Sequence, residues 1–276
     1  MIHRIPRSTI GIVSNVFVFN GDSRHTNGLS INSITVRRLP TVANSPMGVE
    51  SQAESYYWTT DDLGQNIALW TPAGRDPLAA SPLFVVCHGF GWDEKLTWNG
   101  QGGKYTQGRP ERPFYKGLVT NGWIVASSFS FGDNWGNSNG VRSVSDLIRF
   151  TKRHFKVGAV WISGNSMGGL TALNWLAQHK GEADGLVAEY PVCSLSSMLS
   201  ASQFSNSIVA AYGLAANGRN YRKLTAGFDP LVGPASRFGR VPSIWFFDPD
   251  EGVVPPCHRA DQNRPLMGTS KPATLR

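Results

Sequence analysis

The residues with the clearest chemical potential read Gly-Asn-Ser-Met-Gly-Gly at 164–169. They follow an apolar run at 159–163 and precede a segment with helical periodicity that begins near Gly169. Between a strand and a helix, G-x-S-x-G is typical of a nucleophile elbow, in which a strained turn holds the serine hydroxyl exposed. We therefore predict Ser166 as a nucleophile, with the Met167 N–H beside it as a donor to an oxyanion. The alternative interpretation is an ordinary glycine-rich turn with an N-cap serine.

A second candidate follows the apolar run at 83–87, where the sequence reads His88-Gly89-Phe90-Gly91. An acyl-transfer site needs two fixed N–H donors for the developing negative oxygen, and glycine lets the backbone face that oxygen. The Phe90 N–H is our candidate for the second donor. We interpret His88 as a packed or loop-orienting side chain rather than as a base.

A third candidate is the acidic loop that begins at Asp248, directly after the apolar run at 243–247. It offers two adjacent carboxylates, Asp250 and Glu251, and either could orient an imidazole from the end of a strand. A solvated acidic turn is the alternative interpretation of the same residues.

Apolar, β-branched runs alternate with amphipathic segments along the chain, and these elements must position the three candidates. The pattern predicts a hairpin at 56–60 and 65–71, strands at 83–87, 123–127, 159–163, 185–189 and 243–247, and helices at about 113–120, 143–155 and 169–179. The strands after the hairpin are apolar throughout, as expected where helices cover both faces of a parallel sheet. We predict an α/β fold with a mostly parallel sheet and flanking helices.

The pattern also divides the chain into parts. Residues 1–50 are rich in Ser, Asn, Arg and Thr, and we expect a polar N-terminal arm or a small β-appendage there. The main domain then spans 51–276. Within it, residues 192–240 have a helical pattern but no clear strand, which predicts an inserted helical cap.

From about Tyr56 to Pro256 the chain resembles the α/β-hydrolase superfamily, in particular its bacterial serine esterase and peptidase-like members. The motifs that carry the resemblance occur in the family's order and read HGFG, GDNWGN at 132–137, GNSMGG, EYPVC at 189–193 and DPDEGVVP at 248–255. The resemblance implies Ser166 as nucleophile, the Phe90 and Met167 amides as oxyanion donors, and an acid at 250 or 251. A gapless comparison of the last motif favours Glu251, whereas its D-x-x-V form favours Asp250.

The chain departs from this family at its C-terminal end. The family's catalytic histidine follows a further helix and strand after the acid, and a helix, strand and turn need about 20 residues. Only 20 residues follow Pro256, and the part after Asn263 holds two prolines and no histidine. His258, the one histidine after the acid, falls where Pro255 and Pro256 would open a helix, and we interpret it as more typical of a helix surface than of a base. We therefore expect a C-terminally short fold and weak activity.

Composition excludes several classes of protein. The 276 residues are 41% hydrophobic and include nine Trp and 14 Phe, enough for a large core and too many for disorder. The formal net charge is +7, but the basic residues are scattered, so we expect no nucleic-acid partner. The three cysteines lack metal-site spacing, and we expect buried free thiols.

We find no targeting signal and no cofactor-binding motif in the sequence. No apolar run approaches the ~18 residues of a membrane span, and we predict neither a span nor a signal peptide, which leaves a cytoplasmic location by default. The glycine-rich stretch at 99–105 fails the P-loop pattern, because Trp98 occupies the first glycine position and Tyr105 the Ser/Thr position. We expect no metal and no organic cofactor, and the pattern does not predict an oligomeric state.

These observations predict a serine hydrolase that cleaves a carboxylic ester or small amide through an acyl-enzyme. The alternative is a catalytically impaired or non-catalytic protein of the same fold that serves binding. The two differ in whether Ser166 reacts with a serine-directed probe.

Overall fold

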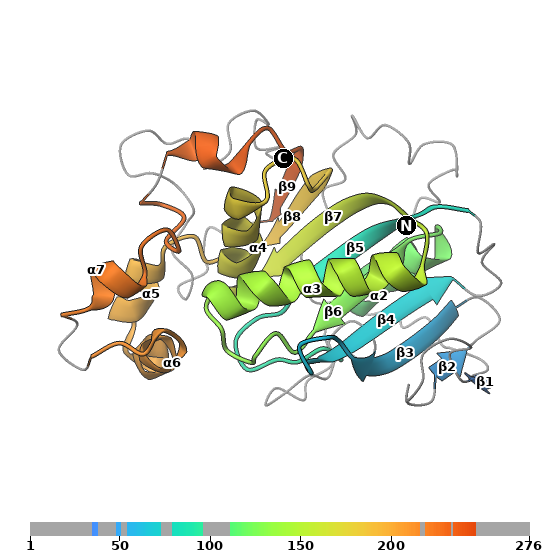
Figure 1. Ribbon diagram of the computed structural model, residues 1–276, viewed down its shortest axis with the longest axis horizontal. Helices are drawn as coiled ribbons and strands as arrows, with labels where there is room; N and C mark the ends of the chain where they lie inside the picture. The colour runs from blue at the N-terminus through green and yellow to red at the C-terminus, as the bar shows by residue number, and fades with distance from the viewer. Residues whose placement is uncertain are drawn as a thin grey trace, which may run out of the picture.

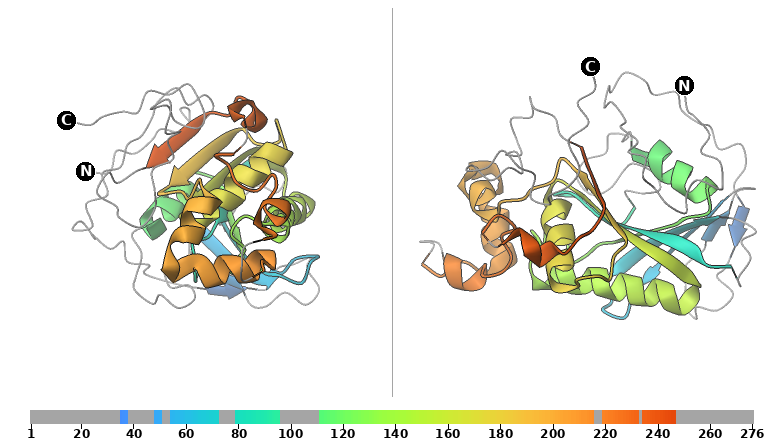
Figure 2. Two further views of the ribbon diagram at one scale, coloured as in Figure 1. Left: turned by 90° about the vertical axis from the view of Figure 1, so that its left-hand side faces the viewer. Right: turned by 90° about the horizontal axis from the view of Figure 1, so that it is seen from above.

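The computed structural model describes residues 54–72, 79–95, 111–215, 219–232 and 234–246, together with two short strands before them (Figure 1). The strands among these residues form one nine-stranded sheet with the order β1-β2-β3-β4-β6-β5-β7-β8-β9. Helices lie on both faces of this sheet (Figures 1 and 2).

One half of the sheet is parallel. It consists of β6 (Ile124–Ser128), β5 (Ser81–Cys87), β7 (Val157–Asn165), β8 (Gly185–Glu189) and β9 (Ser243–Phe246). The carboxyl ends of parallel strands meet at one edge of a sheet, where α/β proteins place their ligands. The segments that carry the candidate residues therefore leave the sheet at one edge.

The other half of the sheet is antiparallel. Its strands are β1 (Thr35–Arg37), β2 (Gly48–Glu50), β3 (Glu54–Thr60) and β4 (Asn66–Pro72), and β4 pairs with β6. The predicted hairpin is confirmed as β3 and β4. Its turn is closed by Asp61, whose Oδ1 accepts from two backbone N–H groups of the turn at 3.0 and 2.8 Å.

Two hydrophobic cores lie on opposite faces of the sheet. Successive side chains of a strand point to opposite faces, and along β4 Leu69 belongs to one core and Trp70 to the other. Helices α3 (Ser138–His154) and α4 (Met167–Gln178) cover the first face, and α2 (Glu111–Thr120) covers the second (Figures 1 and 2).

Helix α3 forms because Val141, Val144 and Ile148 recur at helical spacing and are buried against the sheet. It begins five residues before the predicted start. Asn137 caps it by accepting from the Gly140 N–H at 3.0 Å, and the polar residues of the first turn concealed this start from the apolar pattern.

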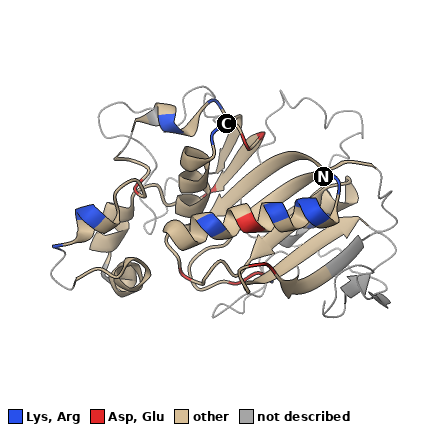
Figure 3. Ribbon diagram, viewed as in Figure 1, with Lys and Arg blue, Asp and Glu red and all other residues tan. Residues whose placement is uncertain are grey.

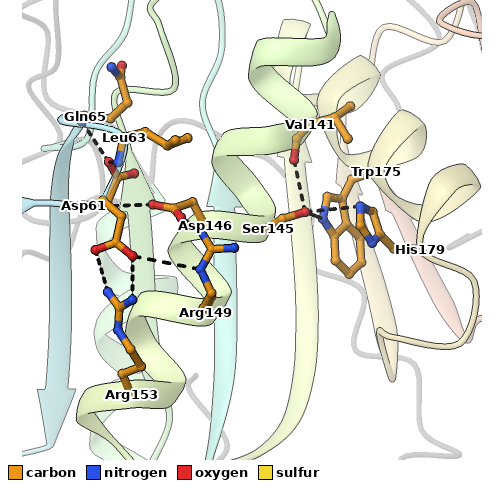
Figure 4. A network of polar contacts seen from close by, with 11 residues as sticks. Asp61, Leu63, Gln65, Val141, Ser145, Asp146, Arg149, Arg153, Trp175 and His179 are labelled. Carbon is orange, nitrogen blue, oxygen red and sulfur yellow. Dashed lines mark hydrogen bonds and ion pairs between the residues drawn. The ribbon is translucent and has the colours of Figure 1, made fainter.

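An ion pair and a hydrogen bond attach the hairpin turn to α3 (Figure 4). Arg153 donates to both carboxylate oxygens of Asp62 at 2.5 and 2.7 Å, and the Asp62 N–H donates to Asp146 at 3.1 Å. The Arg153 guanidinium lowers the pKa of the Asp62 carboxyl. The pair is solvent-exposed, so we assign it a small contribution to stability.

A helical insertion separates β8 from β9. It contains α5 (Leu195–Ser200), α6 (Ser202–Tyr212), α7 (Tyr221–Leu224) and the 3₁₀ turn η2 (Ala235–Phe238). In Figure 1, α5, α6 and α7 lie beyond the carboxyl end of the parallel strands, while η2 packs against α4.

The cysteines differ from the expectation of three free thiols. Cys87 is free and buried, but Cys193 is disulfide-bonded. An odd number of cysteines excludes a complete pairing and still permits one bridge, and the spacing of the three cysteines does not indicate which of them are paired.

Lys and Arg residues occur in α3, in α7 and in other elements of the described part of the chain (Figure 3). Among these residues, no helix is long and apolar enough to cross a membrane.

Candidate active site

Ser166 lies at the junction of β7 and α4 with a backbone conformation of φ 50° and ψ −117°. A positive φ is uncommon for a residue with a β-carbon and persists only where the surroundings enforce it. Here the Ser166 N–H donates to Glu189 O at 3.0 Å, and Ser166 O accepts from the N–H groups of Gly169 and Val192 at 2.9 and 2.8 Å. The side chain remains partly exposed at the carboxyl edge of the sheet.

Two glycines allow the chain to make this turn. A β-carbon on Gly164 would lie 2.5 Å from the Gly168 carbonyl oxygen, and one on Gly168 would overlap the Cys87 carbonyl oxygen. Any larger residue would therefore push α4 away from β7 and β5. The contact of Gly168 with the end of β5 also brings the loop after β5 next to Ser166.

That loop contains the predicted oxyanion donor. The Gly91 N–H donates to Asp133 Oδ1 at 2.6 Å, whereas the Phe90 and Met167 N–H groups have no hydrogen-bond partner among the described residues. Both unbonded N–H groups belong to segments that adjoin Ser166. Met167 follows Ser166 directly, and a β-carbon on Gly89, the residue before Phe90, would lie 3.2 Å from Oδ1 of Asn165, the residue before Ser166.

Aromatic side chains adjoin the same loops. The Phe90 ring lies 5.8 Å from the Trp135 ring and 5.3 Å from the Phe204 ring of α6, measured between centroids. Trp135 is fixed by its Nε1–H, which donates to Ser207 Oγ at 2.8 Å. Phe90 and Phe204 are partly exposed, so the inserted helix α6 adds an aromatic side chain beside the loop after β5.

The acid and base predicted from the sequence, Asp250, Glu251 and His258, lie outside the described residues. The strand that leads to them is β9, which pairs in parallel with β8 and ends at Phe246. The Tyr190 N–H donates to Phe246 O at 3.0 Å. Thus β9 ends beside the segment that follows Glu189, the residue that accepts from the Ser166 N–H.

Another serine within the described residues, Ser145, is hydrogen-bonded to a histidine (Figure 4), and that histidine also contacts a carboxylate. Ser145 Oγ lies 3.2 Å from His179 Nε2, and His179 Nδ1 lies 3.1 Å from Glu182 Oε1. Ser145 is in the middle of α3, where helical hydrogen bonds occupy the backbone N–H groups. Its Oγ also accepts from Trp175 Nε1–H at 2.9 Å. With no free N–H donors beside it, this group is suited to joining α3 to α4 rather than to acyl transfer.

Cys87 is an unsuitable nucleophile although it precedes the HGFG loop. Burial raises the pKa of its thiol to about 12. The reactive form of cysteine is the thiolate, so Cys87 stays protonated and packs in the core. No group of His, Cys, Asp and Glu residues in the described ranges is arranged to hold a metal ion.

The sequence did not predict the contact of Asp133 with the loop after β5. Asp133 belongs to the GDNWGN motif, for which we predicted no role. Its carboxylate lies in the loop after β6 and accepts from the Gly91 N–H of the loop after β5. A contact between residues 42 positions apart leaves no local periodicity in the sequence.

No protein-family model matches the sequence, and no curated protein matches it. Solved structures do resemble it. One of a pair of prolyl endopeptidases matches with a TM-score of 0.50 and 14% identity over 72% of this chain and 31% of that one. An acylaminoacyl peptidase from Pyrococcus horikoshii gives a TM-score of 0.47 and 13% identity over 74% of this chain and 38% of that one.

The chain therefore spans about a third of the length of the prolyl endopeptidase that it resembles. At this level of identity the likeness concerns the fold and leaves the chemistry open. The strand order, the flanking helices and the likeness to the endopeptidase agree with the resemblance seen in the sequence, and the chain has the α/β-hydrolase fold.

Proposed function

We propose that this chain is a serine hydrolase that cleaves a carboxylic ester or small amide, with Ser166 as the nucleophile. The observation that carries the proposal is the backbone of Ser166, with φ 50° at the junction of β7 and α4 and two unbonded N–H groups on adjoining segments. This arrangement suits an exposed nucleophile next to an oxyanion site.

The reaction follows from these positions. Ser166 Oγ attacks the carbonyl carbon and its proton passes to a base, while the carbonyl oxygen gains negative charge and accepts from the Phe90 and Met167 N–H groups. The bond to the leaving alcohol or amine then breaks, and the base returns the proton to that group. Water repeats the sequence on the acyl-enzyme, which releases the acid and restores Ser166.

The candidate base is His258, and the candidate acid that would orient it is Asp250 or Glu251. If His258 does not reach Ser166, the hydroxyl lacks activation, and the oxyanion donors with binding alone give only ~10³ to 10⁴-fold catalysis over water. In that case the chain is a weak hydrolase or a binding protein that keeps the fold.

A fluorophosphonate probe tests the proposal directly. We expect labelling of one serine per chain, located at Ser166 by peptide mass spectrometry and abolished by Ser166→Ala. Ser145→Ala is the matched control, because Ser145 also contacts a histidine, and it should leave the labelling unchanged. Labelling at Ser145, or none in the unaltered protein, contradicts the proposal.

A further inference from the structure

His88 is almost fully buried, at 1% exposure, between the loops that follow β5 and β6. Its Nδ1 lies 2.8 Å from Gly89 O, and its Nε2 lies 2.9 Å from Phe129 O. Both partners are backbone carbonyl oxygens, which only accept hydrogen bonds.

This geometry restricts the protonation state of the imidazole. A neutral imidazole has one N–H, and its other nitrogen carries a lone pair. In either neutral tautomer a lone pair would face one of the two carbonyl oxygens, and that buried contact would be unsatisfied and repulsive. The imidazolium form alone has the two N–H donors that the two carbonyl oxygens require.

A second contact joins the same loops in the reverse direction. His88 reaches from the loop after β5 to a carbonyl of the loop after β6, whereas Asp133 reaches back to the Gly91 N–H at 2.6 Å. The two contacts lie on either side of Phe90 in the sequence. Phe90 is thus held between two anchored neighbours while its own N–H stays unbonded.

Two acidic residues come from the loops that His88 joins. Glu94, which is 4% exposed, comes from the same loop, and Asp133 comes from the loop after β6. The turn at 164–169 contributes no ionisable side chain. Burial raises the pKa of Glu94, and the charge of His88 opposes that shift.

We propose that His88 is doubly protonated in the folded protein and, together with Asp133, acts as a positioning residue that holds the Phe90 N–H toward the oxyanion of the reaction. The assignment to an oxyanion rests on the function proposed above, whereas the protonation state does not.

The proton count is measured by nitrogen-15 NMR of the histidine side chains of the full chain at neutral pH, with His88→Gln used to assign the signals. We expect both His88 nitrogens to carry a proton. His179 is an internal comparison, because its Nε2 faces the Ser145 hydroxyl, which can donate as well as accept. One protonated and one bare nitrogen on His88 would overturn the proposal.

Kinetics test the positioning role. Glutamine can donate to only one of the two carbonyl sites, so His88→Gln should lower kcat toward nitrophenyl acetate by up to ~10²-fold, as expected for a displaced oxyanion donor, with KM little changed. Asp133→Ala removes the reverse contact at a partly exposed residue, and it should lower kcat even if His88→Gln fails to fold. An unchanged kcat in the folded variants contradicts the role of His88. Failure of the fluorophosphonate probe to label Ser166 would instead contradict the proposed function and leave the NMR result standing.

Discussion

The turn at Ser166 could be predicted from the sequence because the residues that it requires are close together in the chain. Glycine is needed at 164 and 168, where β-carbons would meet backbone atoms of neighbouring segments, and a serine with positive φ then follows from the turn. A five-residue pattern can encode this geometry. The contacts of His88 and Asp133 could not be predicted in the same way, because their partners lie 41 and 42 residues away in the chain.

Replacement of Ser166 by alanine removes the proposed nucleophile. We expect hydrolysis of a nitrophenyl ester to fall toward background, with a loss of up to ~10⁴ to 10⁶ in rate in an enzyme with a complete triad and a smaller loss here if no base is present. The circular dichroism spectrum should be unchanged, because the hydroxyl is partly exposed. Full activity in Ser166→Ala would rule out the nucleophile assignment.

The candidate acid is one of two adjacent residues. Adjacent residues of a loop point in different directions, so only one of Asp250 and Glu251 can orient an imidazole. We expect Asp250→Ala and Glu251→Ala to differ in kcat, with Asp250→Ala the more damaging. Two variants with the activity of the unaltered protein would exclude this loop from the site.

At the scale of the elements, periodicity predicted the helices and strands well and their ends less well. Strand β5 is buried along almost its whole length and is apolar on both faces, which marks it in the sequence. Helix α4 begins at Met167, two residues before the predicted start, because Gly168 and Gly169 disfavour a helix by propensity and are retained for close packing. Packing overrides propensity at this position.

The packing of α4 on β5 gives a test with a matched control. In Gly168→Ala the new β-carbon would overlap the Cys87 carbonyl, so α4 must move away from β5. We expect a strong loss of stability and of probe labelling at Ser166. In Gly117→Ala, within α2, the β-carbon meets nothing within 4 Å. That variant should gain up to ~1 kcal/mol, the difference in helix propensity.

Thermal unfolding of both variants, followed by circular dichroism, measures these effects. A Gly168→Ala protein as stable as the unaltered chain would show that the elbow does not depend on close contact between α4 and β5. Loss of stability in Gly117→Ala would show that the propensity argument fails for α2.

At the scale of the whole molecule, the α/β class could be predicted, but the pairing across the sheet could not. The short strands β1 and β2 extend the antiparallel half, although residues 1–50 have no strong strand pattern of their own. Such pairing depends on an available sheet edge rather than on local sequence. The disulfide of Cys193 likewise has no signal in the sequence.

The disulfide of Cys193 bears on the identity of the base. The chain has three cysteines, Cys87 is free and Cys193 is bonded, so we expect Cys257 to be the partner. Cys193 follows Val192, whose N–H donates to Ser166 O at 2.8 Å. A bridge to Cys257 would therefore tether the neighbouring His258 to the segment that binds Ser166.

Thiol titration of the unreduced, denatured protein should then find one thiol, and reduction should raise the count to three. A bridge that closes a loop of about 65 residues contributes about 4 kcal/mol by the loop-entropy estimate, so reduction should also lower the thermal midpoint.

Kinetics test whether the bridge positions His258 as the base. If it does, both reduction and His258→Ala lower kcat, and the expectation of weak activity drawn from the sequence is wrong. If neither treatment changes kcat, His258 has no role and the weak activity is that of an unassisted serine. Three thiols without reduction would contradict the bridge itself.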